Sequence, residues 1–328
     1  MKAIVCEKYG PPSQLVLKEL AALVPKEKEV ILSVKACSLN FPDTLIIQGK
    51  YQYKPELPFT PGSDISGIIK EVGSGVTHLK AGDEVFGFVA NGGFAEEVAA
   101  PVQAVFKKPK GMDNAIAASF LMAYGTSYHA LKDRAKIQTG ETLVVLGASG
   151  GVGLAAVELG KRMGANVIAA ASSSEKLALC KTFGADETIN YSTEDLKTRI
   201  KELTGGKGAD VIYDPVGGGF SEPALRAMAW EGRFLVIGFA AGDIPKIPLN
   251  LTLLKGCQIV GVFWGLFAQK FPKENLKNTE QLIFWFNEGK LKPHIHASYP
   301  LAEAPKAMQE MMERKVQGKV IIDCSNIQ

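Results

Sequence analysis

The sequence predicts an α/β protein in which a doubly wound parallel sheet follows a β-rich region. Short apolar runs separated by glycine-containing turns fill roughly the first 110 residues, a pattern typical of a barrel or sandwich. From about residue 125, apolar runs alternate with helical patterns. A segment with four glycines, GASGGVG at 147–153, joins the first of these later runs to its helix. Together these three observations predict two domains of different architecture.

The expected strands of the β-rich region are short and are separated by turn signals such as PGSD, AGD and NGG. We place them at 3–6, 15–20, 30–36, 65–72 and 84–88. Six further strands are expected at 143–146, 166–171, 187–190, 210–213, 233–237 and 259–263. Helical patterns at 152–163, 175–183 and 194–204 each end at a glycine, as helices commonly do. Strands joined by helices in this way predict a parallel, doubly wound sheet of the Rossmann type.

Two elements near the end of the chain exceed what this sheet needs, a helix at 274–287 and a strand at 318–322. We expect them to return to the first domain. The predicted domains are therefore 1–122 together with 266–328, and 123–265. The uncharged run 114–131 is interrupted by polar residues, so we interpret it as a buried connecting helix rather than a membrane span.

Charge and cysteine content exclude several classes of protein. The chain of 328 residues has a formal net charge of +3, with its lysines and arginines spread along it. We therefore expect neither a membrane surface nor a nucleic acid as partner. The five cysteines are scattered without a CxxC pair, which indicates free thiols in a reducing compartment. The closely spaced charges of MKAIVCEKYG argue against a signal peptide, and we expect a cytoplasmic protein.

The segment GASGGVG follows a predicted strand and opens a predicted helix. Free backbone N–H groups and the helix dipole at such a point favour a pyrophosphate. Gly147, Gly150 and Gly153 permit the tight turn, the close approach of phosphate and the close packing of helix on strand. A plain strand-to-helix turn is the alternative. The six strands around the segment favour a dinucleotide site.

The end of the second strand predicts which dinucleotide is bound. A carboxylate at this point would bind the ribose 2′-hydroxyl and repel a 2′-phosphate. The strand instead ends AAASSSEK, so that Ala171 stands at its tip, followed by three serines and Lys176. The serines could simply cap the next helix. Because the acid is missing, we predict NADPH as the cofactor.

Two dehydrogenase superfamilies have glycine loops of this kind. The spacing of Gly147, Gly151 and Gly153 also fits the GxxxGxG of short-chain reductases, and YHALK at 128–132 supplies a YxxxK. Short-chain reductases, however, have the loop near the N-terminus and the YxxxK well after it. The reversed order in this chain indicates that the match is accidental.

Six segments distributed along the chain carry a more specific resemblance: SLNFPDTLIIQGKY (38–51), LPFTPGSDISG (57–67), GTSYHAL (125–131), GASGGVGLAA (147–156), INYSTEDL (189–196) and GKVII (318–322). In these segments the chain resembles the medium-chain dehydrogenase/reductase superfamily. Within that superfamily it resembles the zinc-free NADPH:quinone oxidoreductases, the zeta-crystallin-like family. The resemblance implies a GroES-like, partly open barrel for the first domain, closed by the C-terminal segment.

The resemblance also indicates where a metal would be bound. Zinc-dependent members take ligands from a Cys in the segment matching SLNFPD and a His in the segment matching PGSD, where this chain has Asn40 and Ser63. The four-cysteine lobe is absent, and we interpret His294 and His296 as polar surface. We predict no metal site. Without a Lewis acid to stabilise an alkoxide, the substrate should already be electrophilic, such as a quinone or an α,β-unsaturated carbonyl.

Candidate site residues follow from the resemblance by motif. Asn40, Tyr51 and Thr126 are predicted as catalytic, and Tyr51 and Thr126 also as cofactor contacts. Asn40 has an amide donor at the vacant ligand position, Tyr51 matches a tyrosine beside the nicotinamide, and Thr126 should lie near the nicotinamide. Alternatively, Tyr51 only packs against the ring and Asn40 only holds its loop together, since positioning can supply much of the rate.

Further cofactor contacts are implied by the same matches. The pyrophosphate cradle is expected at Ser149, Gly150, Gly151 and Val152. The 2′-phosphate is expected among Ser172, Lys176, Tyr191 and Arg314. The nicotinamide half is expected to meet the backbones of Gly238, Phe239, Phe263 and Trp264.

Three functions remain open from the sequence. The first is an NADPH:quinone reductase, and the second is an NADPH-dependent reductase of activated C=C bonds in enals, enones or acryloyl thioesters. The third is a structural or RNA-binding protein that also binds NADPH, although no basic cluster interleaved with aromatic residues supports it. We also expect a homodimer formed through the edge of the second sheet, because the segment 246–265 is apolar and ends in an edge strand.

Overall fold

The computed structural model describes residues 1–325, and the chain forms two compact units. The first unit contains Met1–Met122 and the segment from Pro293 onward, and the second contains Ala123–Lys292. Within residues 1–325, no helix has both the length and the apolar character needed to cross a membrane. All five cysteines are buried and carry free thiols.

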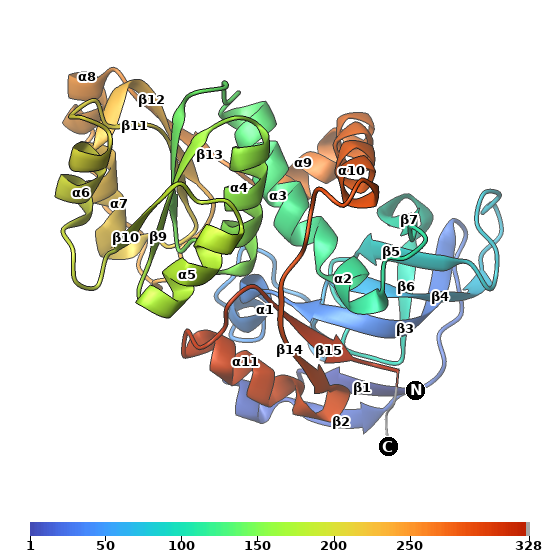
Figure 1. Ribbon diagram of the computed structural model, residues 1–328. Coiled ribbons are helices and arrows are strands. Elements are labelled where there is room, and N and C mark those ends of the chain that lie inside the picture. Colours follow the sequence, from blue (N-terminus) through green and yellow to red (C-terminus); the bar gives the residue numbers. More distant parts are fainter. Residues whose placement is uncertain (326–328) are drawn as a thin grey trace. The chain divides into compact units, whose positions relative to one another are not determined.

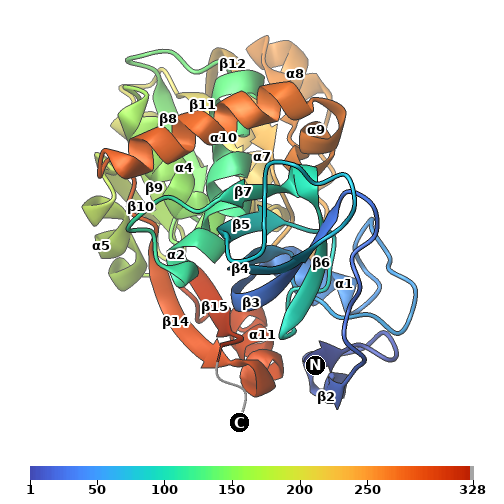
Figure 2. The same cartoon turned by 90° about the vertical axis from the view of Figure 1, so that its right-hand side faces the viewer.

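The first unit is β-rich, as predicted. Seven strands form one sheet in the order β14-β15-β3-β4-β5-β7, with β6 paired to β3, and β1 and β2 form a separate pair (Figure 2). The strands are β1 Lys2–Val5, β2 Val16–Glu19, β3 Glu29–Leu39, β4 Asp64–Val72, β5 Glu84–Phe88, β6 Glu97–Pro101, β7 Val105–Lys107, β14 Ile295–Pro300 and β15 Lys319–Asp323. The helices of this unit are α1 Phe41–Ile46, α2 Asn114–Ala118 and α11 Ala304–Met312, with 3-10 turns at Pro12–Gln14, Val102–Ala104 and Leu301–Glu303.

Strand β3 is the centre of the first unit, because it pairs with β4, β6 and β15. Its sequence, EVILSVKACSL, is buried over most of its length, which agrees with the apolar residues that it places on both faces. Its last residues pair antiparallel with β15, so that Cys37 lies opposite Ile322. The expected return of the final strand to the first domain is therefore observed.

The second unit has the predicted doubly wound sheet. Six parallel strands lie in the order β10-β9-β8-β11-β12-β13. They are β8 Thr142–Leu146, β9 Asn166–Ala171, β10 Glu187–Asn190, β11 Ala209–Asp214, β12 Met228–Val236 and β13 Gln258–Gly261. The helices are α4 Gly151–Arg162, α5 Ser174–Thr182, α6 Leu196–Leu203, α7 Ser221–Arg226, α8 Asn250–Lys255, α9 Trp264–Lys270 and α10 Pro272–Asn287. Helices α4 and α5 cover one face of the sheet and α6 and α7 the other (Figure 1).

The segment 266–292 differs from the prediction, because it belongs to the second unit rather than to the first. Side chains of α10 explain this placement. Trp285 packs edge-on against Tyr128 with ring centroids 5.4 Å apart, and the Arg162 guanidinium lies over the Trp285 ring at 4.8 Å. Asn278 Oδ1 accepts a hydrogen bond from Lys132 Nζ at 2.7 Å. The predicted helix at 274–287 is confirmed, but its amphipathic periodicity does not identify the core against which it packs.

The connecting segment 114–131 is helical but not uniformly α-helical. It continues from α2 into a π-helical turn at Leu121–Gly125, a short α3 at Thr126–Tyr128 and a second π-helical turn at His129–Arg134. π-Turns inside helices occur frequently at functional sites. Here the two turns flank Thr126, one of the predicted site residues.

Candidate active site

The glycine loop connects β8 to α4 and has the geometry of an anion cradle. Gly147 has a φ of +57°, and a Cβ on it would lie 2.8 Å from Val216 Cγ2. Gly150 is the N-cap of α4 in an extended conformation, and its N–H donates to Gly147 O at 3.0 Å. The first N–H groups of a helix have no intrahelical acceptor, and those of α4 are therefore able to bind an anion at this point.

The glycines of this loop serve different purposes. A Cβ on Gly153 would lie 2.4 Å from Gly147 O and 2.8 Å from Ala148 Cα, so the protein's own backbone requires glycine there. A Cβ on Gly150 would meet nothing closer than Gly147 O at 3.5 Å, an ordinary contact. The fold itself therefore tolerates a side chain at Gly150, and a ligand approaching the backbone is what would need this position to be glycine.

The second half of the predicted cradle is held from behind by a buried hydroxyl. Ser149 is buried, whereas Gly151 and Val152 in the first turn of α4 are partly exposed. The Ser127 hydroxyl donates to Val152 O at 2.9 Å, and its Oγ also lies 2.9 Å from Tyr213 Oη. This hydrogen bond fixes the start of α4 against the element that carries Thr126. Ser127 and Tyr213 were not selected from the sequence, because nothing local distinguishes them from ordinary core residues.

At the end of β9 the polar residues form the cluster expected from the sequence. Lys176 Nζ donates to Ser172 Oγ at 3.3 Å, so the cation is held beside the first hydroxyl after the strand. Ser173 caps α5, because its Oγ accepts a hydrogen bond from Lys176 N at 3.3 Å. The helix cap considered for AAASSSEK is therefore observed at Ser173, while the 2′-phosphate site at Ser172 and Lys176 stays a prediction.

The end of β10 completes this cluster. Tyr191 N donates to Ala171 O at 3.2 Å, which places the residue directly beside the tip of β9. Its ring packs on Phe220 with centroids 4.5 Å apart. Ser192 Oγ donates to Ser172 O at 3.0 Å, a contact that the sequence did not predict. Ser172, Lys176 and Tyr191 thus lie together, as a site for a 2′-phosphate requires.

Asp214, at the end of β11, organises the loops beside this cluster. Its carboxylate accepts hydrogen bonds from the N–H groups of Val216 and Gly217 at 2.8 and 2.9 Å and from the Ser221 hydroxyl at 2.6 Å. Burial raises the pKa of the Asp214 carboxyl, and these hydrogen bonds oppose that shift. The Gly238 N–H donates to the Asp214 backbone carbonyl at 3.3 Å. An acid at a strand end followed by PVGGG was the available signal for this residue, and it was missed.

The residues expected near the nicotinamide differ in exposure. Thr126 and Trp264 are buried, whereas Phe263 is 53% exposed. The Trp264 indole donates to Asn275 Oδ1 at 3.0 Å, and it packs so closely on Gly125 that a Cβ there would lie 2.7 Å from the ring. Its side chain is thus committed to the protein, which agrees with an expected contact through the backbone alone. Phe239 packs closely on Gly217, because a Cβ added to Gly217 would lie 2.8 Å from the Phe239 ring.

In the first unit, Asn40 directly follows β3 and is the N-cap of α1. Asn40 N donates to Asp43 Oδ2 at 2.8 Å, and Asp43 N donates to Asn40 O at 3.0 Å. Burial raises the pKa of Asp43 to about 7, although the Asn40 N–H and the Lys319 charge oppose the shift. Burial, followed by the negative charge of Asp43, also raises the pKa of Tyr51, whose ring packs on the core of this unit. Asn40 and Asp43 therefore belong to one buried polar region, and the charge of Asp43 also acts on the partly buried Tyr51.

The predicted residues are divided between the two units. Asn40, Tyr51 and Arg314 lie in the first unit, and the remaining predicted residues lie in the second. Arg314 follows α11 in a left-handed conformation with a φ of +60°, and its N–H donates to Met311 O at 3.1 Å. It therefore ends a helix of the first unit, and its role at the 2′-phosphate stays a prediction.

The residues at the expected metal position do not fit a zinc ion. An amide and a hydroxyl, at Asn40 and Ser63, replace the thiolate and imidazole that zinc prefers. Asn40 Oδ1 instead accepts a hydrogen bond from the ammonium of Lys319, and that charge would repel a metal cation. Within residues 1–325, no three His, Cys, Asp or Glu side chains converge as a metal site requires.

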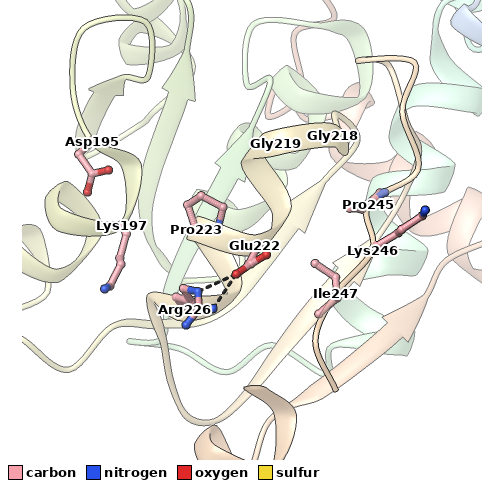
Figure 3. A pocket seen from close by; sticks show the side chains of 10 residues that line it. All are labelled: Asp195, Lys197, Gly218, Gly219, Glu222, Pro223, Arg226, Pro245, Lys246 and Ile247. Carbon is pink, nitrogen blue, oxygen red and sulfur yellow. Dashed lines mark hydrogen bonds and ion pairs between the residues drawn. The ribbon is translucent and has the colours of Figure 1, made fainter. Parts of the chain in front are cut away.

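A depression of about 480 Å³ lies elsewhere on the second unit, between α6, α7 and the loop at 245–247 (Figure 3). The labelled Arg226 guanidinium turns toward Glu222 and hydrogen-bonds to its Oε1 at 2.9 and 2.6 Å. Lys197 and Lys246 on its walls are exposed. None of the predicted site residues lines it. The Arg226 guanidinium is already paired with Glu222, and we therefore do not assign this depression to the cofactor.

Comparisons with known proteins agree with this geometry. Two family models match, an alcohol dehydrogenase GroES-like domain at residues 26–110 and a zinc-binding dehydrogenase at residues 151–281. The quinone oxidoreductase-like protein 2 homolog of Nematostella vectensis is 41% identical over 98% of this chain and 88% of its own length. Human quinone oxidoreductase is 33% identical over 98% of this chain and 97% of its own.

A solved structure gives the same result. Escherichia coli quinone oxidoreductase complexed with NADPH superposes with a TM-score of 0.94 at 29% identity, over 98% of this chain and all of that one. The β-rich first unit, the Rossmann-type second unit and these relatives confirm the resemblance and the fold class inferred from the sequence. The chain belongs to the medium-chain dehydrogenase/reductase superfamily, in its quinone oxidoreductase (zeta-crystallin-like) family.

Proposed function

We propose that this protein is an NADPH-dependent oxidoreductase that reduces quinones. The observation that carries the proposal is the joint presence of the glycine cradle before α4 and the Ser172–Lys176 pair at the end of β9. A cation and a hydroxyl stand where an NAD-specific site has a carboxylate. The names of the relatives support a quinone as the acceptor.

The residues that would hold NADPH follow from the geometry. The pyrophosphate would lie over Gly150, against the first N–H groups of α4. The 2′-phosphate would accept hydrogen bonds from Lys176 and Ser172, with Tyr191 beside them. When bound, NADPH supplies a hydride to the acceptor. The chain's own part is to orient the reactants and to stabilise the charge that develops on the acceptor oxygen.

We further propose that the reaction needs no metal. Conjugation in a quinone spreads the negative charge that arrives with the hydride, so the protein has to supply only modest hydrogen bonds. The Tyr51 hydroxyl is able to donate one, because a phenol is protonated at neutral pH and burial raises the pKa of this one further. Zinc bound stoichiometrically in elemental analysis, or activity lost to a chelator, would contradict this part of the proposal.

A substrate panel tests the activity. Purified protein should oxidise NADPH in the presence of benzoquinones and naphthoquinones, more slowly with NADH, and should not oxidise simple alcohols with NADP⁺. Enals, enones and acryloyl thioesters belong in the same panel, because reduction of activated C=C bonds uses the same hydride chemistry. Faster turnover of an enone than of every quinone would move the assignment to C=C reduction, and inactivity with all acceptors would refute both.

We also propose a homodimer formed through β13. This strand ends the sheet order, and next to it Leu249 and Leu253 in the α8 region are 78% and 80% exposed. Val262 N donates to Val236 O, so alternation along the strand directs the N–H groups of Ile259 and Gly261 away from β12, toward the open edge of the sheet. Pairing with a second copy would satisfy these groups and cover the leucines.

Light scattering after size exclusion tests the dimer. Leu253→Glu should convert it to a monomer without unfolding it, because this side chain is exposed in the single chain. Glu187→Lys, on β10 at the opposite edge of the same sheet, is the matched control and should leave the dimer intact. A wild-type monomer at micromolar concentration, or a dimer that persists in Leu253→Glu, would contradict the proposal.

A further inference from the structure

A lysine is buried in the core of the first unit. Lys319 is the first residue of β15, and its side chain is only 7% exposed. Its ammonium donates a hydrogen bond to Asn40 Oδ1 and lies 3.5 Å from Asp64 Oδ2. The strand pairing explains this position, because Val320 lies opposite Leu39 in the β15–β3 ladder. A lysine immediately before Val320 is thereby brought beside the residue that follows Leu39.

The surroundings of this ammonium are mainly acidic. Asp64 and Asp43 are both buried, and their charges favour the protonated lysine, while burial lowers the pKa of Lys319. Burial raises the pKa of the Cys37 thiol, and the charge of Lys319 opposes this shift. A buried charge without a partner is strongly destabilising, so two buried carboxyl groups and one buried ammonium depend on one another.

The same network fixes the carboxamide of Asn40 at both ends. Its Oδ1 accepts from Lys319, while its Nδ2 donates to Ser38 O and to Asp64 Oδ2, each at 3.3 Å. The other oxygen of Asp64 accepts from Met122 N at 3.2 Å. An amide nitrogen has two hydrogens, and both have acceptors here. In this arrangement the Asn40 amide has no hydrogen left to donate to a substrate. The network therefore fixes where the Asn40 side chain lies.

We propose that Lys319 is a positioning residue for the turn that carries Asn40. Its ammonium supplies the internal positive charge that holds the Asn40 carboxamide and the Asp64 carboxylate in one arrangement. Lys319 acts through these two residues and does not itself touch the reactants. The kinetic consequence rests on the proposed reductase function, whereas the coupling among the three residues does not.

A double-mutant cycle in the full-length protein tests the coupling. Lys319→Met removes the charge at nearly constant volume, and Asp64→Asn removes the opposing charge. Each single variant leaves a buried charge uncompensated and should lower the melting temperature by roughly 5–15 °C. The double variant should melt closer to the wild type than either single variant does. Lys306→Met, which breaks an exposed pair with Glu303, is the control and should change the melting temperature by no more than about 2 °C.

Two readouts then separate positioning from a purely structural role. In the double variant, amide exchange in the segment 38–43 should be faster than in the wild type although overall stability is recovered, because the carboxamide of Asn40 has lost its cation. The kcat for quinone should fall about tenfold while the Kd for NADPH, measured by fluorescence, changes less than twofold. Additive losses of melting temperature, or a double variant with wild-type exchange and kcat, would overturn the proposal. If the wild type reduces no acceptor, the proposed function fails, and the melting and exchange data still decide the role of Lys319.

Discussion

Two strand-to-helix turns in this protein have opposite designs. The turn after β8 is built from glycines, and above Gly150 the backbone leaves room that the fold itself does not use. The turn after β3 is filled with side chains, and Asn40, Asp43 and Lys319 satisfy one another within the buried interior. The N–H groups at the first turn have no acceptor within the helix, and an anionic ligand would provide acceptors for them. The second already contains its own charges of both signs.

The difference teaches how two turns of similar topology are adapted to different tasks. A ligand cradle needs exposed N–H groups and free space, and glycine provides both without adding a charge. A rigid support needs every buried polar group to have a partner, since a partly satisfied network is worse than none. Substitutions at the turn after β8 should therefore change the affinity for the cofactor. Substitutions at the turn after β3 should change the stability of the protein and its dependence on pH.

The largest effect is expected at Asp43 in the filled turn. Its pKa is about 7 in the folded protein and near 3.8 when the carboxyl is free, so the folded state binds the proton more tightly. Stability from this group is therefore highest below pH 4, falls as the pH rises to 7 and is constant above. Relative to wild type, Asp43→Asn should gain up to about 4 kcal/mol between pH 4 and pH 8, because one pKa unit corresponds to about 1.4 kcal/mol.

Urea unfolding at a series of pH values measures this difference. Asp83→Asn, which alters a carboxylate paired with Lys107 near the surface of the same unit, is the control. A difference between Asp43→Asn and wild type that does not change with pH would show that the carboxyl of Asp43 is not the group responsible.

The next effect distinguishes two glycines of the turn after β8, which we call the open turn because its N–H groups face unfilled space. Gly150→Ala should leave the melting temperature within about 3 °C of wild type, because its Cβ meets only Gly147 O at 3.5 Å. It should weaken NADPH binding about a hundredfold, as an overpacking cost of 2–3 kcal/mol against the pyrophosphate would give. Gly153→Ala should instead lower the melting temperature, since its Cβ would lie 2.4 Å from Gly147 O. Fluorescence titration and thermal unfolding of both variants check this, and equal effects of the two would contradict the distinction.

The cation beside the open turn should have a smaller and more selective effect. A charge-assisted hydrogen bond contributes about 1.5–3 kcal/mol, so Lys176→Ala should raise the KM for NADPH by roughly ten- to a hundredfold. The KM for NADH should hardly change. Lys181→Ala, on the same helix but directed to Asp186, is the control. If Lys176→Ala affected both cofactors equally, the assignment of the 2′-phosphate site would be wrong.

The smallest effect is expected at Tyr51. Its ring packs on the core of the first unit, and Tyr51→Phe preserves that packing while removing the hydroxyl. We expect kcat for quinone to fall less than about threefold, because conjugation in the acceptor already spreads the charge. A fall of a hundredfold or more in steady-state assays would instead identify the hydroxyl as a proton donor in the reaction.

Most of the second unit was predictable from the sequence because its signals are local. The strands from 143 to 237 are short runs that alternate with helices, the first three of these helices end at a glycine, and the observed strands agree with the predicted ones within about five residues. Strands β6, β7 and β14 were missed because they are short or interrupted by polar residues and are defined by pairing partners distant in the chain. The helix α10 was found, but its assignment to the first domain was wrong, since amphipathic periodicity does not identify the partner.

The candidate site shows the same division. The glycine loop and the Ser172–Lys176 pair lie within short segments, and the sequence located both. Lys319 is 279 residues from Asn40, and only the pairing of β15 with β3 brings them together. Asp214 was also missed, although its position at the end of a strand before three glycines was a local signal for an organising acid. Whether Asn40, Tyr51 and Thr126 act in the reaction stays a prediction.

Hydrogen exchange of the backbone amides, with and without NADPH, tests the contrast between the two turns most directly. The N–H groups of 151–153 in the open turn should exchange quickly in the free protein and at least about tenfold more slowly with saturating NADPH, because the helix itself offers them no acceptor. The N–H groups of Asn40 and Asp43 should already exchange slowly without NADPH, since each has an acceptor within 3.0 Å, and should change little. Unchanged exchange at 151–153 on addition of NADPH would contradict the account, as would fast exchange at Asn40 and Asp43 in the free protein.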